Sequence, residues 1–352
     1  MKALKIGAAA LAALVAIAVV GVMTMVSKAN HRLERRWDDV KGVNVPVPWP
    51  LADDELAALR EQKKAELTTK AAAAGAGEAA PAPADADLLL GVDLVALARE
   101  RALARGKHLI EARAGCTDCH GADYGGKVII DAPPMGVWAA PNITIAGNTK
   151  DFTPADWDRI IRHGIAKDGT SATMPAIDYT SMSDRELSDI IATITAAPPV
   201  DRPNVENKMG PLRGVLIATG AIPVAAELID HGTGHAKLPP GEAVTLEFGK
   251  HVVSGCVGCH GLNLAGGPVP GGDPKWPEAA NLTPDATGLA GWKPEDFRRV
   301  AREGKSQDGR ALQDPMKGVA LAMRNMTDTE LDAAFLYLQS LPARAKGAPA
   351  AP

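Results

Sequence analysis

The stretch C-T-D-C-H at residues 116–120 decides the organisation of this chain, and it recurs as C-V-G-C-H at residues 256–260, 140 positions later. These two stretches contain all four cysteines of the 352-residue sequence. In each stretch two thiols lie about one helical turn apart, and a histidine follows the second thiol directly. An interpretation of the chain therefore has to explain the same C-x-x-C-H pattern twice.

C-x-x-C-H is the attachment motif of c-type haem. The two thiols add to the two vinyl groups of one porphyrin, and the adjacent histidine is the proximal ligand of the iron. The sequence therefore predicts two covalently bound haem c groups. The predicted attachment residues and proximal ligands are Cys116, Cys119 and His120 for the first haem, and Cys256, Cys259 and His260 for the second.

Three other uses of the cysteine pairs explain the pattern less well. A redox dithiol of the thioredoxin type belongs to a βαβ context, which the sequence does not show. Two C-x-x-C pairs that bind one zinc ion usually lie about 15–20 residues apart. Two structural disulfides would suit an exported protein, but they leave both following histidines unexplained.

Length and composition limit the classes of protein to consider. A chain of 352 residues is long enough for two domains of ordinary size. The net charge of −4 at pH 7 gives no sign of a nucleic-acid-binding surface, so nucleic acid is not among the expected partners. The 35 glycines and 27 prolines predict loop-rich domains with short helices.

The segment Ile6–Val26 is an uncharged run of 21 residues between basic flanks. As a helix it would be about 31 Å long, enough for a hydrocarbon core about 30 Å thick. A cleaved signal peptide is the alternative, but its apolar region usually has only about 7–15 residues and ends at a small-x-small site. We therefore expect an uncleaved membrane anchor over residues 1–30. Because haem c is attached on the outer face of the bacterial inner membrane, the remainder is expected in the periplasm.

The rest of the chain divides by composition. Residues 31–92 read as a proline-rich extended neck, a helix over 51–70 and an Ala/Pro/Gly linker over 71–87. Two haem-binding domains follow at 93–199 and 241–341. Between them a connector at 200–240 carries an apolar stretch, 211–226, predicted to form a helix packed between the domains. The last residues, 342–352, read as a disordered Ala/Pro tail.

The two domains are repeats of each other. Each contains an Asn-Ile/Leu-Thr segment, a helix beginning at a proline, an Arg-x-Gly turn, and a final helix opened by a Ser/Thr-to-Glu capping box. In the first domain these begin at Asn142, Pro154, Arg162 and Ser183, and in the second at Asn281, Pro294, Arg302 and Thr327. A repeat of this quality indicates two copies of one fold.

With these motifs, the chain resembles the di-haem members of the class I cytochrome c family. It is similar in particular to the cytochrome subunits of bacterial membrane-bound alcohol and sugar-acid dehydrogenases, over about 93–199 and 241–341. The resemblance implies an all-α fold with two tandem class I cytochrome c domains behind one N-terminal transmembrane helix. In each domain the first and last helices cross beside the haem, and a loop before the last helix supplies a distal methionine.

Met174 fits the distal ligand of the first domain, because it precedes a proline in the loop before the last helix. The second domain has no Met-Pro pair. There Met316 lies eleven residues before the cap Thr327, which compares with nine residues between Met174 and Ser183. We predict Met316 as the second distal ligand, with Met323, four residues before the cap, as the rival.

The other histidines and two arginines have weaker assignments. His163 corresponds to Glu303 in the second copy, so it is expected to be a surface or hydrogen-bonding residue outside the shared haem machinery. His108 and His251, which are related by the repeat, are expected either to lie at the surface or to pack against neighbouring residues. His231 or His235 as the sixth ligand of a bis-His haem is a minor alternative. Arg162 and Arg302 fit haem propionates as well as solvated helix positions.

The sequence thus predicts an electron-transfer protein, not an enzyme. It would pass single electrons from a respiratory donor, either a dehydrogenase or a quinol-oxidising complex, to an oxidase or another cytochrome, and the cofactor would supply the redox chemistry. Two alternatives stay open: a di-haem cytochrome c peroxidase, which needs an open distal site, and an electron-transfer subunit of a membrane dehydrogenase complex.

Overall fold

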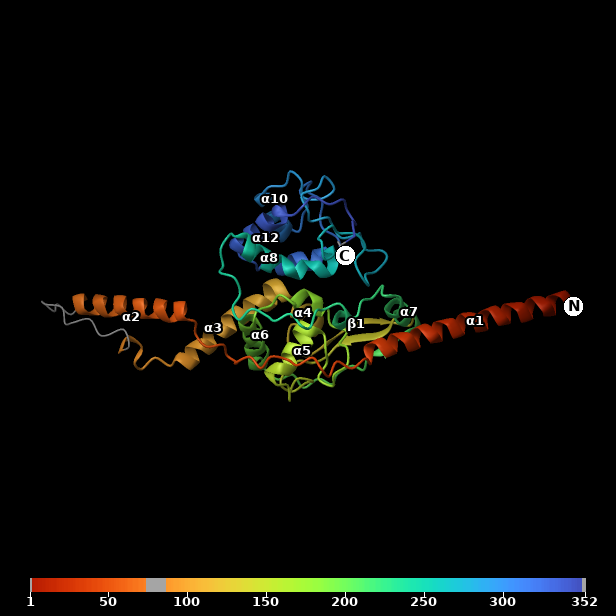
Figure 1. The fold of residues 1–352 in the computed structure, drawn as a ribbon, viewed down its shortest axis with the longest axis horizontal. Coiled ribbons are helices and arrows are strands. Elements are labelled where there is room, and N and C mark those ends of the chain that lie inside the picture. Colours follow the sequence, from red (N-terminus) through yellow and green to blue (C-terminus); the bar gives the residue numbers. More distant parts are fainter. Residues whose placement is uncertain (1, 74–86, 350–352) are drawn as a thin grey trace.

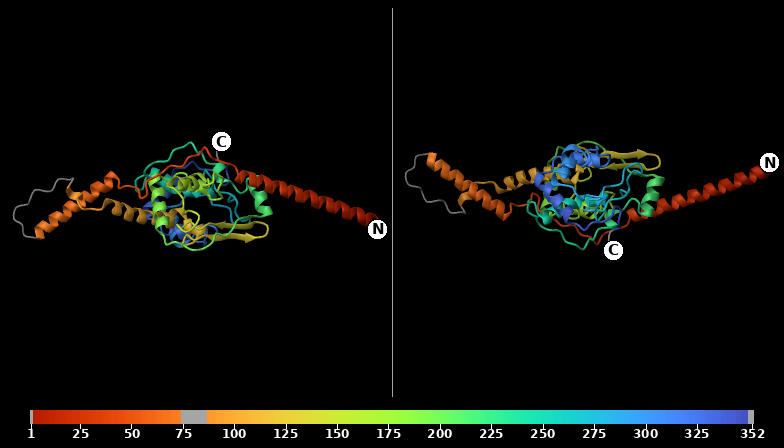
Figure 2. Two further views of the ribbon diagram at one scale, coloured as in Figure 1. Left: turned by 90° about the horizontal axis from the view of Figure 1, so that it is seen from below. Right: turned by 90° about the horizontal axis from the view of Figure 1, so that it is seen from above.

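The computed structural model describes residues 2–73 and 87–349 and shows two helical domains. Domain 1 (residues 93–199) lies at the centre, and domain 2 (residues 241–341) packs on one side of it. Helices α1 (Lys2–Leu33) and α2 (Asp53–Ala73) extend away in opposite directions (Figures 1 and 2). Most of the predicted linker, at 74–86, and the last residues of the predicted tail, 350–352, lie outside the described residues. Residues 342–349, predicted as part of that tail, follow domain 2. They contact this domain through the carbonyl of Ala348, which accepts from Asn263 Nδ2.

Both domains contain the same order of helices. In domain 1 these are α3 (Leu94–His108), the π-helical turn η2 (Leu109–Ala114), α4 (Cys116–His120), α5 (Pro154–His163), the 3₁₀ turn η3 (Ala176–Tyr179) and α6 (Asp184–Ala196). In domain 2 they are α8 (Leu246–Val253), the 3₁₀ turn η5 (Ser254–Cys256), α9 (Val257–His260), α10 (Pro294–Glu303), α11 (Met316–Met323) and α12 (Asp328–Ser340). The predicted all-α class is confirmed, apart from a small sheet.

The final helices begin where the capping boxes predict. The side chains of Ser183 and Thr327 accept from the backbone N–H groups of Glu186 and Glu330, and these glutamates accept in return from the cap backbone. The two exchanged hydrogen bonds satisfy donors that would otherwise be left open at the first turn. Local sequence thus sets the start of both helices.

In both domains the first and last helices cross closely at a glycine. Helix α3 packs against α6, and α8 packs against α12. A Cβ atom on Gly106 would collide with the carbonyl of Asp189, and one on Gly249 would collide with the carbonyl of Ala333. Because glycine has no side chain, the two backbones come into contact there.

Around each crossing lies one apolar core. In domain 1 its largest members include Leu109, Ile110, Ile143, Trp157, Ile161, Leu187, Ile190 and Ile194. In domain 2 they include Phe248, Val253, Leu289, Phe297, Leu331, Phe335 and Leu338.

Domain 1 also carries a three-stranded antiparallel sheet that the sequence analysis did not predict. Strand β1 (Lys127–Ala132) pairs with β2 (Gly136–Ala140), which pairs with β3 (Lys208–Met209). Strands β1 and β2 form a local hairpin, whereas the third strand comes from the connector, far along the chain.

The neck crosses the whole of domain 1 (Figure 1). Val45 is only 3% exposed and belongs to the domain 1 core. The hydroxyl of Ser188 on α6 donates to the carbonyl of Pro46 at 2.6 Å, and the N–H of Val43 donates to Asp158 Oδ2 at 2.6 Å. The neck is extended, as predicted, and it is also a structural part of domain 1. It ends at α2 (Asp53–Ala73).

Helix α1 (Lys2–Leu33) contains a segment, Ala9–Leu33, that is long and apolar enough to cross a membrane. Its last turns pack against α7 (Pro211–Thr219), where Ala29 is fully buried and Val26 lies against Gly214. The apolar stretch 211–226 of the connector was predicted to form a helix packed between the two domains. That holds only in part, because Ile222, which follows the helix, lies against Gly271 of domain 2. The apolar face of α7 is covered by α1 instead, so the connector fixes the base of α1 to domain 1.

Candidate haem sites

The C-x-x-C-H segments follow the first helix of each domain by two different routes. In domain 1 the π-helical turn η2 and Gly115, with φ of +59°, lead into α4. In domain 2 the short 3₁₀ turn η5 leads into α9. The π-helical turn accommodates the three extra residues between Gly-Lys-His and the first cysteine of domain 1, which explains why His108 and His251 stand out of register.

Both proximal histidines are held in the same tautomer. His120 Nδ1 lies 2.8 Å from the carbonyl of Pro141, and His260 Nδ1 lies 2.8 Å from the carbonyl of Ala280. Each Nδ1–H donates to its carbonyl, which leaves Nε2 with a free electron pair. Burial lowers the pKa of both imidazoles, so both are neutral at pH 7. A neutral imidazole with its second nitrogen hydrogen-bonded is the arrangement of a metal ligand.

The Asn-x-Thr repeats hold these carbonyl groups in place. Asn142 directly follows Pro141, and its Oδ1 accepts from the backbone N–H and the hydroxyl of Thr144 at 2.9 and 2.8 Å. Asn281 makes the same two bonds to Thr283 at the same distances. Both asparagines are 1% exposed. The repeated Asn-x-Thr segments therefore fix the backbone that orients each proximal histidine.

The cysteines lie at the edge of the two cores. Cys116 packs against the domain 1 core and Cys256 against the domain 2 core. Burial raises the pKa of both thiols to about 12. Redox-active and metal-binding cysteines have a lowered pKa, so these surroundings do not suit either use. All four cysteines lie within the described residues, and none of them is joined to another.

The predicted distal ligand of domain 1, Met174, lies at the edge of the domain 1 core. Met174 is half-buried and packs against the same core as Cys116. It lies directly before η3, whose Tyr179 hydroxyl donates to the carbonyl of Ala114 at 2.8 Å, two residues before Cys116. The loop that carries Met174 is therefore tied to the attachment segment.

The corresponding segment of domain 2 contains helix α11, with a methionine at each end. The bond from the N–H of Leu312 to the carbonyl of Gly304 matches the bond from Ala172 to Gly164 in domain 1. By this match, Met316 lies two residues beyond the counterpart of Met174. It is half-buried, whereas Met323 packs against the core that includes Cys256. The choice between these two methionines remains a prediction.

Comparison with known proteins agrees with this geometry. Residues 246–342 match the family model described as cytochrome c, and residues 101–192 match the one described as cytochrome c oxidase, cbb3-type, subunit III. The chain thus contains two cytochrome c domains. Each cytochrome c domain binds one haem c covalently through its C-x-x-C-H motif, as predicted.

Several relatives are cytochromes of dehydrogenases. The fructose dehydrogenase cytochrome subunit of Gluconobacter japonicus is 24% identical over 71% of this chain and 55% of its own length. The cytochrome c subunit of alcohol dehydrogenase (quinone) from Gluconacetobacter polyoxogenes is 27% identical over 66% of this chain and 54% of its own length. A diheme cytochrome c-type protein of Cereibacter sphaeroides is 27% identical over 68% of this chain and 86% of its own length. The chain thus spans little more than half the length of the first two.

The two cytochrome c domains contact each other through a reciprocal pair of His–Glu interactions. His108 Nε2 lies 2.9 Å from Glu330 Oε2, and His251 Nε2 lies 2.7 Å from Glu186 Oε1. His108 and His251 occupy equivalent positions of the repeat, and so do the capping glutamates Glu186 and Glu330. The domains are therefore related by an approximate two-fold axis, as in an isologous dimer interface.

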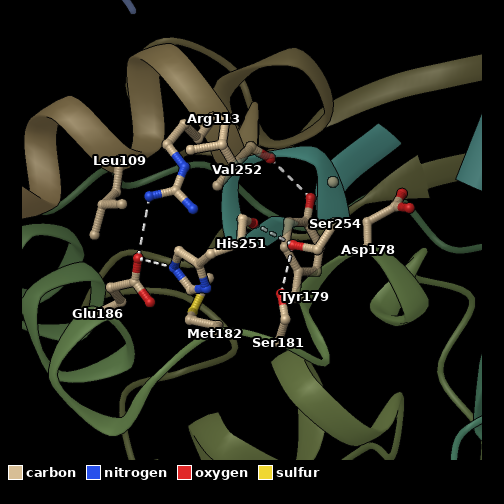
Figure 3. A pocket seen from close by; sticks show the side chains of 12 residues that line it. Leu109, Arg113, Asp178, Tyr179, Ser181, Met182, Glu186, His251, Val252 and Ser254 are labelled. Carbon is tan, nitrogen blue, oxygen red and sulfur yellow. Dashed lines mark hydrogen bonds and ion pairs between the residues drawn. The ribbon is translucent and has the colours of Figure 1, made fainter. Parts of the chain in front are cut away.

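A small cavity of about 40 Å³ lies in this interface, which is enough for a few water molecules. Figure 3 shows Arg113 and His251 beside Glu186, both bonded to the same carboxylate oxygen, Oε1. At the other end Asp178 Oδ1 accepts from the N–H of Gly258, inside the second C-x-x-C-H motif, at 2.8 Å. Burial raises the pKa of Asp178 to about 6, and the Gly258 bond opposes this. The role of Asp178 has no signal in the sequence.

Proposed function

We propose that this chain is a membrane-anchored di-haem electron carrier whose cytochrome c domains lie in the periplasm, and that it serves as the non-catalytic cytochrome subunit of a membrane dehydrogenase. When bound, each haem supplies a one-electron Fe(III)/Fe(II) couple. The chain's own residues orient the ligands, exclude water and hold the two sites together.

One observation carries this proposal: the turn η3 contacts both haem-attachment segments. Tyr179 reaches the carbonyl of Ala114 beside the first C-x-x-C-H motif, and Asp178 reaches the N–H of Gly258 within the second. Both attachment helices therefore border one interface, which is what a protein that passes electrons between two cofactors requires. Two separate domains on a flexible tether would not provide it.

The anchor supports a fixed position near the membrane. Arg32, at the end of α1, makes an ion pair with Glu227 in the connector and also donates to the carbonyl of Ile217 in the α7 helix. Together with the α1–α7 packing, these contacts join the membrane helix to domain 1 without a free linker. We infer that domain 1 stays at a constant height above the bilayer, within reach of a partner in the same membrane.

The proposed donor is a membrane dehydrogenase, because several relatives are named as cytochrome subunits of such enzymes. The proposed acceptor is an oxidase or another cytochrome. A peroxidase would need one open distal position. The half-buried methionines before the last helix of each domain favour a closed site at both haems, with Met174 and Met316 as the proposed distal ligands.

The test uses the full chain purified from detergent-solubilised membranes. We expect two covalent haems per chain in a pyridine haemochrome assay, retention in the membrane after a high-salt wash, and a dehydrogenase that co-purifies and reduces both haems when its substrate is added. A matched control replaces residues 1–30 by a cleavable signal peptide and should yield a soluble protein with both haems. Catalytic turnover of hydrogen peroxide by the half-reduced protein would replace this proposal with the peroxidase.

A further inference from the structure

A cluster of histidines lies outside both haem sites, where the connector packs on domain 1. His163 ends α5, and His231 and His235 come from the connector. Asp158, five residues before His163 on the same helix, completes the cluster. Asp158 is fully buried and His163 is 4% exposed. No sequence pattern links these histidines, since His163 and His231 lie 68 positions apart.

Backbone carbonyls and a neighbouring ring set the tautomer of each histidine. His231 Nε2 lies 2.8 Å from the carbonyl of Ala226, so it carries the proton and donates it there. His231 Nδ1 is then an acceptor for His163 Nδ1–H at 3.1 Å. His235 Nδ1 donates to the carbonyl of Thr180 at 3.0 Å. His163 and His235 are therefore each left with an unprotonated Nε2.

The unprotonated Nε2 atoms of His163 and His235 lie near the carboxylate of Asp158. One ligand atom each from Asp158, His163 and His235 lies within 4.8 Å of the other two. His163 Nε2 is 3.8 Å from Asp158 Oδ2, which is too far for a hydrogen bond. Among the described residues, four buried side-chain nitrogens have no hydrogen-bond partner, and Nε2 of His235 is one of them; Nη2 of Arg162 is another. The electron pair of His235 Nε2 is therefore open to a ligand.

We propose that Asp158, His163 and His235 bind one divalent transition-metal ion of the zinc class. Two imidazole nitrogens and one carboxylate are a common ligand set for Zn²⁺. Metal–ligand distances of about 2.0–2.2 Å place tetrahedral ligands roughly 3.3–3.6 Å apart, so the three atoms need to close by little more than about 1 Å. The outer nitrogen of each ligating ring already donates a hydrogen bond, to His231 or to Thr180, as metal-ligating histidines do.

The charges around the cluster are compatible with a cation. Arg162 makes ion pairs with both Asp158 and Asp184, so the two carboxylates exceed the one guanidinium. Burial lowers the pKa of His163 to about 4 and also lowers that of His235, so both rings are neutral at pH 7. A neutral ring needs to lose no proton before it binds a metal ion.

The site belongs to domain 1 alone. At the equivalent positions of domain 2, Arg298 and Glu303 replace Asp158 and His163. A bound ion would join α5 of domain 1 to the connector that leads to domain 2. It would therefore fix the end of that connector, close to where domain 2 begins, and we expect at most one such ion for every two haem irons.

The test measures zinc binding by the full chain with both haems in detergent. After treatment with a chelator, equilibrium dialysis against micromolar Zn²⁺ should load one zinc per two irons by elemental analysis. His235→Gln and His163→Gln should each weaken binding at least tenfold. The matched control is His31→Gln, at an exposed histidine near the end of α1, which should bind zinc as the unmodified chain does.

Zinc should also raise the midpoint of thermal unfolding of the unmodified chain but not that of His235→Gln, because a ligand stabilises only the state that binds it. If His163→Gln fails to acquire haem, His235→Gln decides alone, since His235 is half-buried in the connector. Failure of the unmodified chain to take up zinc, or equal uptake by His235→Gln, would overturn the proposal. Neither outcome depends on the donor, the acceptor or the activity of the cytochrome.

Discussion

The two domains share one repeat, but they differ in how deeply their equivalent residues are buried. The side chain of Arg162 is 0% exposed, whereas that of Arg302 is 35% exposed. Both arginines bond to the backbone before the last helix and to the aspartate that opens it. The neck and the connector lie against domain 1. The repeat therefore determines which groups each arginine contacts. Segments outside the repeat determine how deeply those contacts are buried, and burial decides how much they contribute to stability.

The insertions that distinguish the two copies meet each other. Relative to domain 2, domain 1 has three extra residues, which the π-helical turn η2 accommodates. Relative to domain 1, domain 2 has four extra residues in the segment that contains helix α11. Helix α11 packs against η2, and Asn325 Nδ2 donates to the carbonyl of Glu111 at 3.1 Å. Each insertion therefore forms part of the surface that the other domain contacts.

The largest expected effect concerns the distal methionines. Met174→Ala and Met316→Ala should each open the sixth position of one haem. The reduced protein should then bind carbon monoxide at that haem only, and its potential should fall, because a thioether favours Fe(II). The fall should be on the order of 0.1 V or more, within the roughly 0.8 V that axial ligands span. Carbon monoxide difference spectra and a redox titration measure both effects.

Met323→Ala is the matched control for this prediction. It should leave both haems closed and cost stability only through lost packing in the domain 2 core. If Met323→Ala opens the second haem and Met316→Ala does not, then Met323 is the ligand, and α11 presents its C-terminal end to the iron.

The second prediction contrasts the buried and the exposed arginine. Arg162→Ala should destabilise domain 1 by about 3–5 kcal/mol, because the buried carboxylate of Asp158 then lacks its ion-pair partner. Arg302→Ala should cost about 1 kcal/mol or less, since its aspartate, Asp328, is largely exposed. Urea unfolding followed at the Soret band measures both. Equal losses in the two variants would show that the difference in burial has no energetic consequence.

The third prediction tests whether the helix crossings are equivalent in the two domains. Gly106→Ala and Gly249→Ala each place a methyl group against a carbonyl of the last helix, so the helices have to move apart. Each change should cost about 1–3 kcal/mol by overpacking. Thermal unfolding measures the loss, with Gly318→Ala as control, because a Cβ atom there meets nothing within 4 Å.

The smallest expected effect is the pH dependence of the domain contact. The Glu330 hydrogen bond raises the pKa of His108, although burial and Arg113 oppose it. This contact should stabilise fully below about pH 6.5 and weaken as the pH rises through the raised value. The exposure of His108 limits its weight to about 1 kcal/mol or less. His108→Gln should flatten the alkaline part of a stability–pH profile.

The acid side of the same profile depends on Glu186. Burial alone would raise its pKa, but the His251 hydrogen bond and the charge of Arg113 outweigh burial and lower the pKa to about 2. Its contribution is therefore present above about pH 4.5 and is lost as the pH falls toward 2. If the stability profile of His108→Gln matched that of the unmodified chain at alkaline pH, the role of His108 would be refuted. The prediction for Glu186 at acid pH would still stand.

The sequence by itself determined the number of haems, the predicted attachment residues and the starts of the last helices, and each of these follows from a short local pattern. The all-α class followed from the resemblance to the class I cytochromes c. The chemistry of C-x-x-C-H involves adjacent positions, and a capping box spans four residues, so neither needs the rest of the chain. The proximal histidines His120 and His260 were predicted on this basis.

Only the tertiary structure decided which residues meet across the domains and how deeply they are buried. His108 meets Glu330 across 222 positions of sequence, and the His163 cluster draws on two segments that no local pattern links. The third strand of the sheet and the position of α7 on α1 depend in the same way on distant segments. The physical reason is that burial and tautomer depend on which surfaces come together in the folded chain, and in this protein those surfaces come from the neck, the connector and the other copy of the repeat.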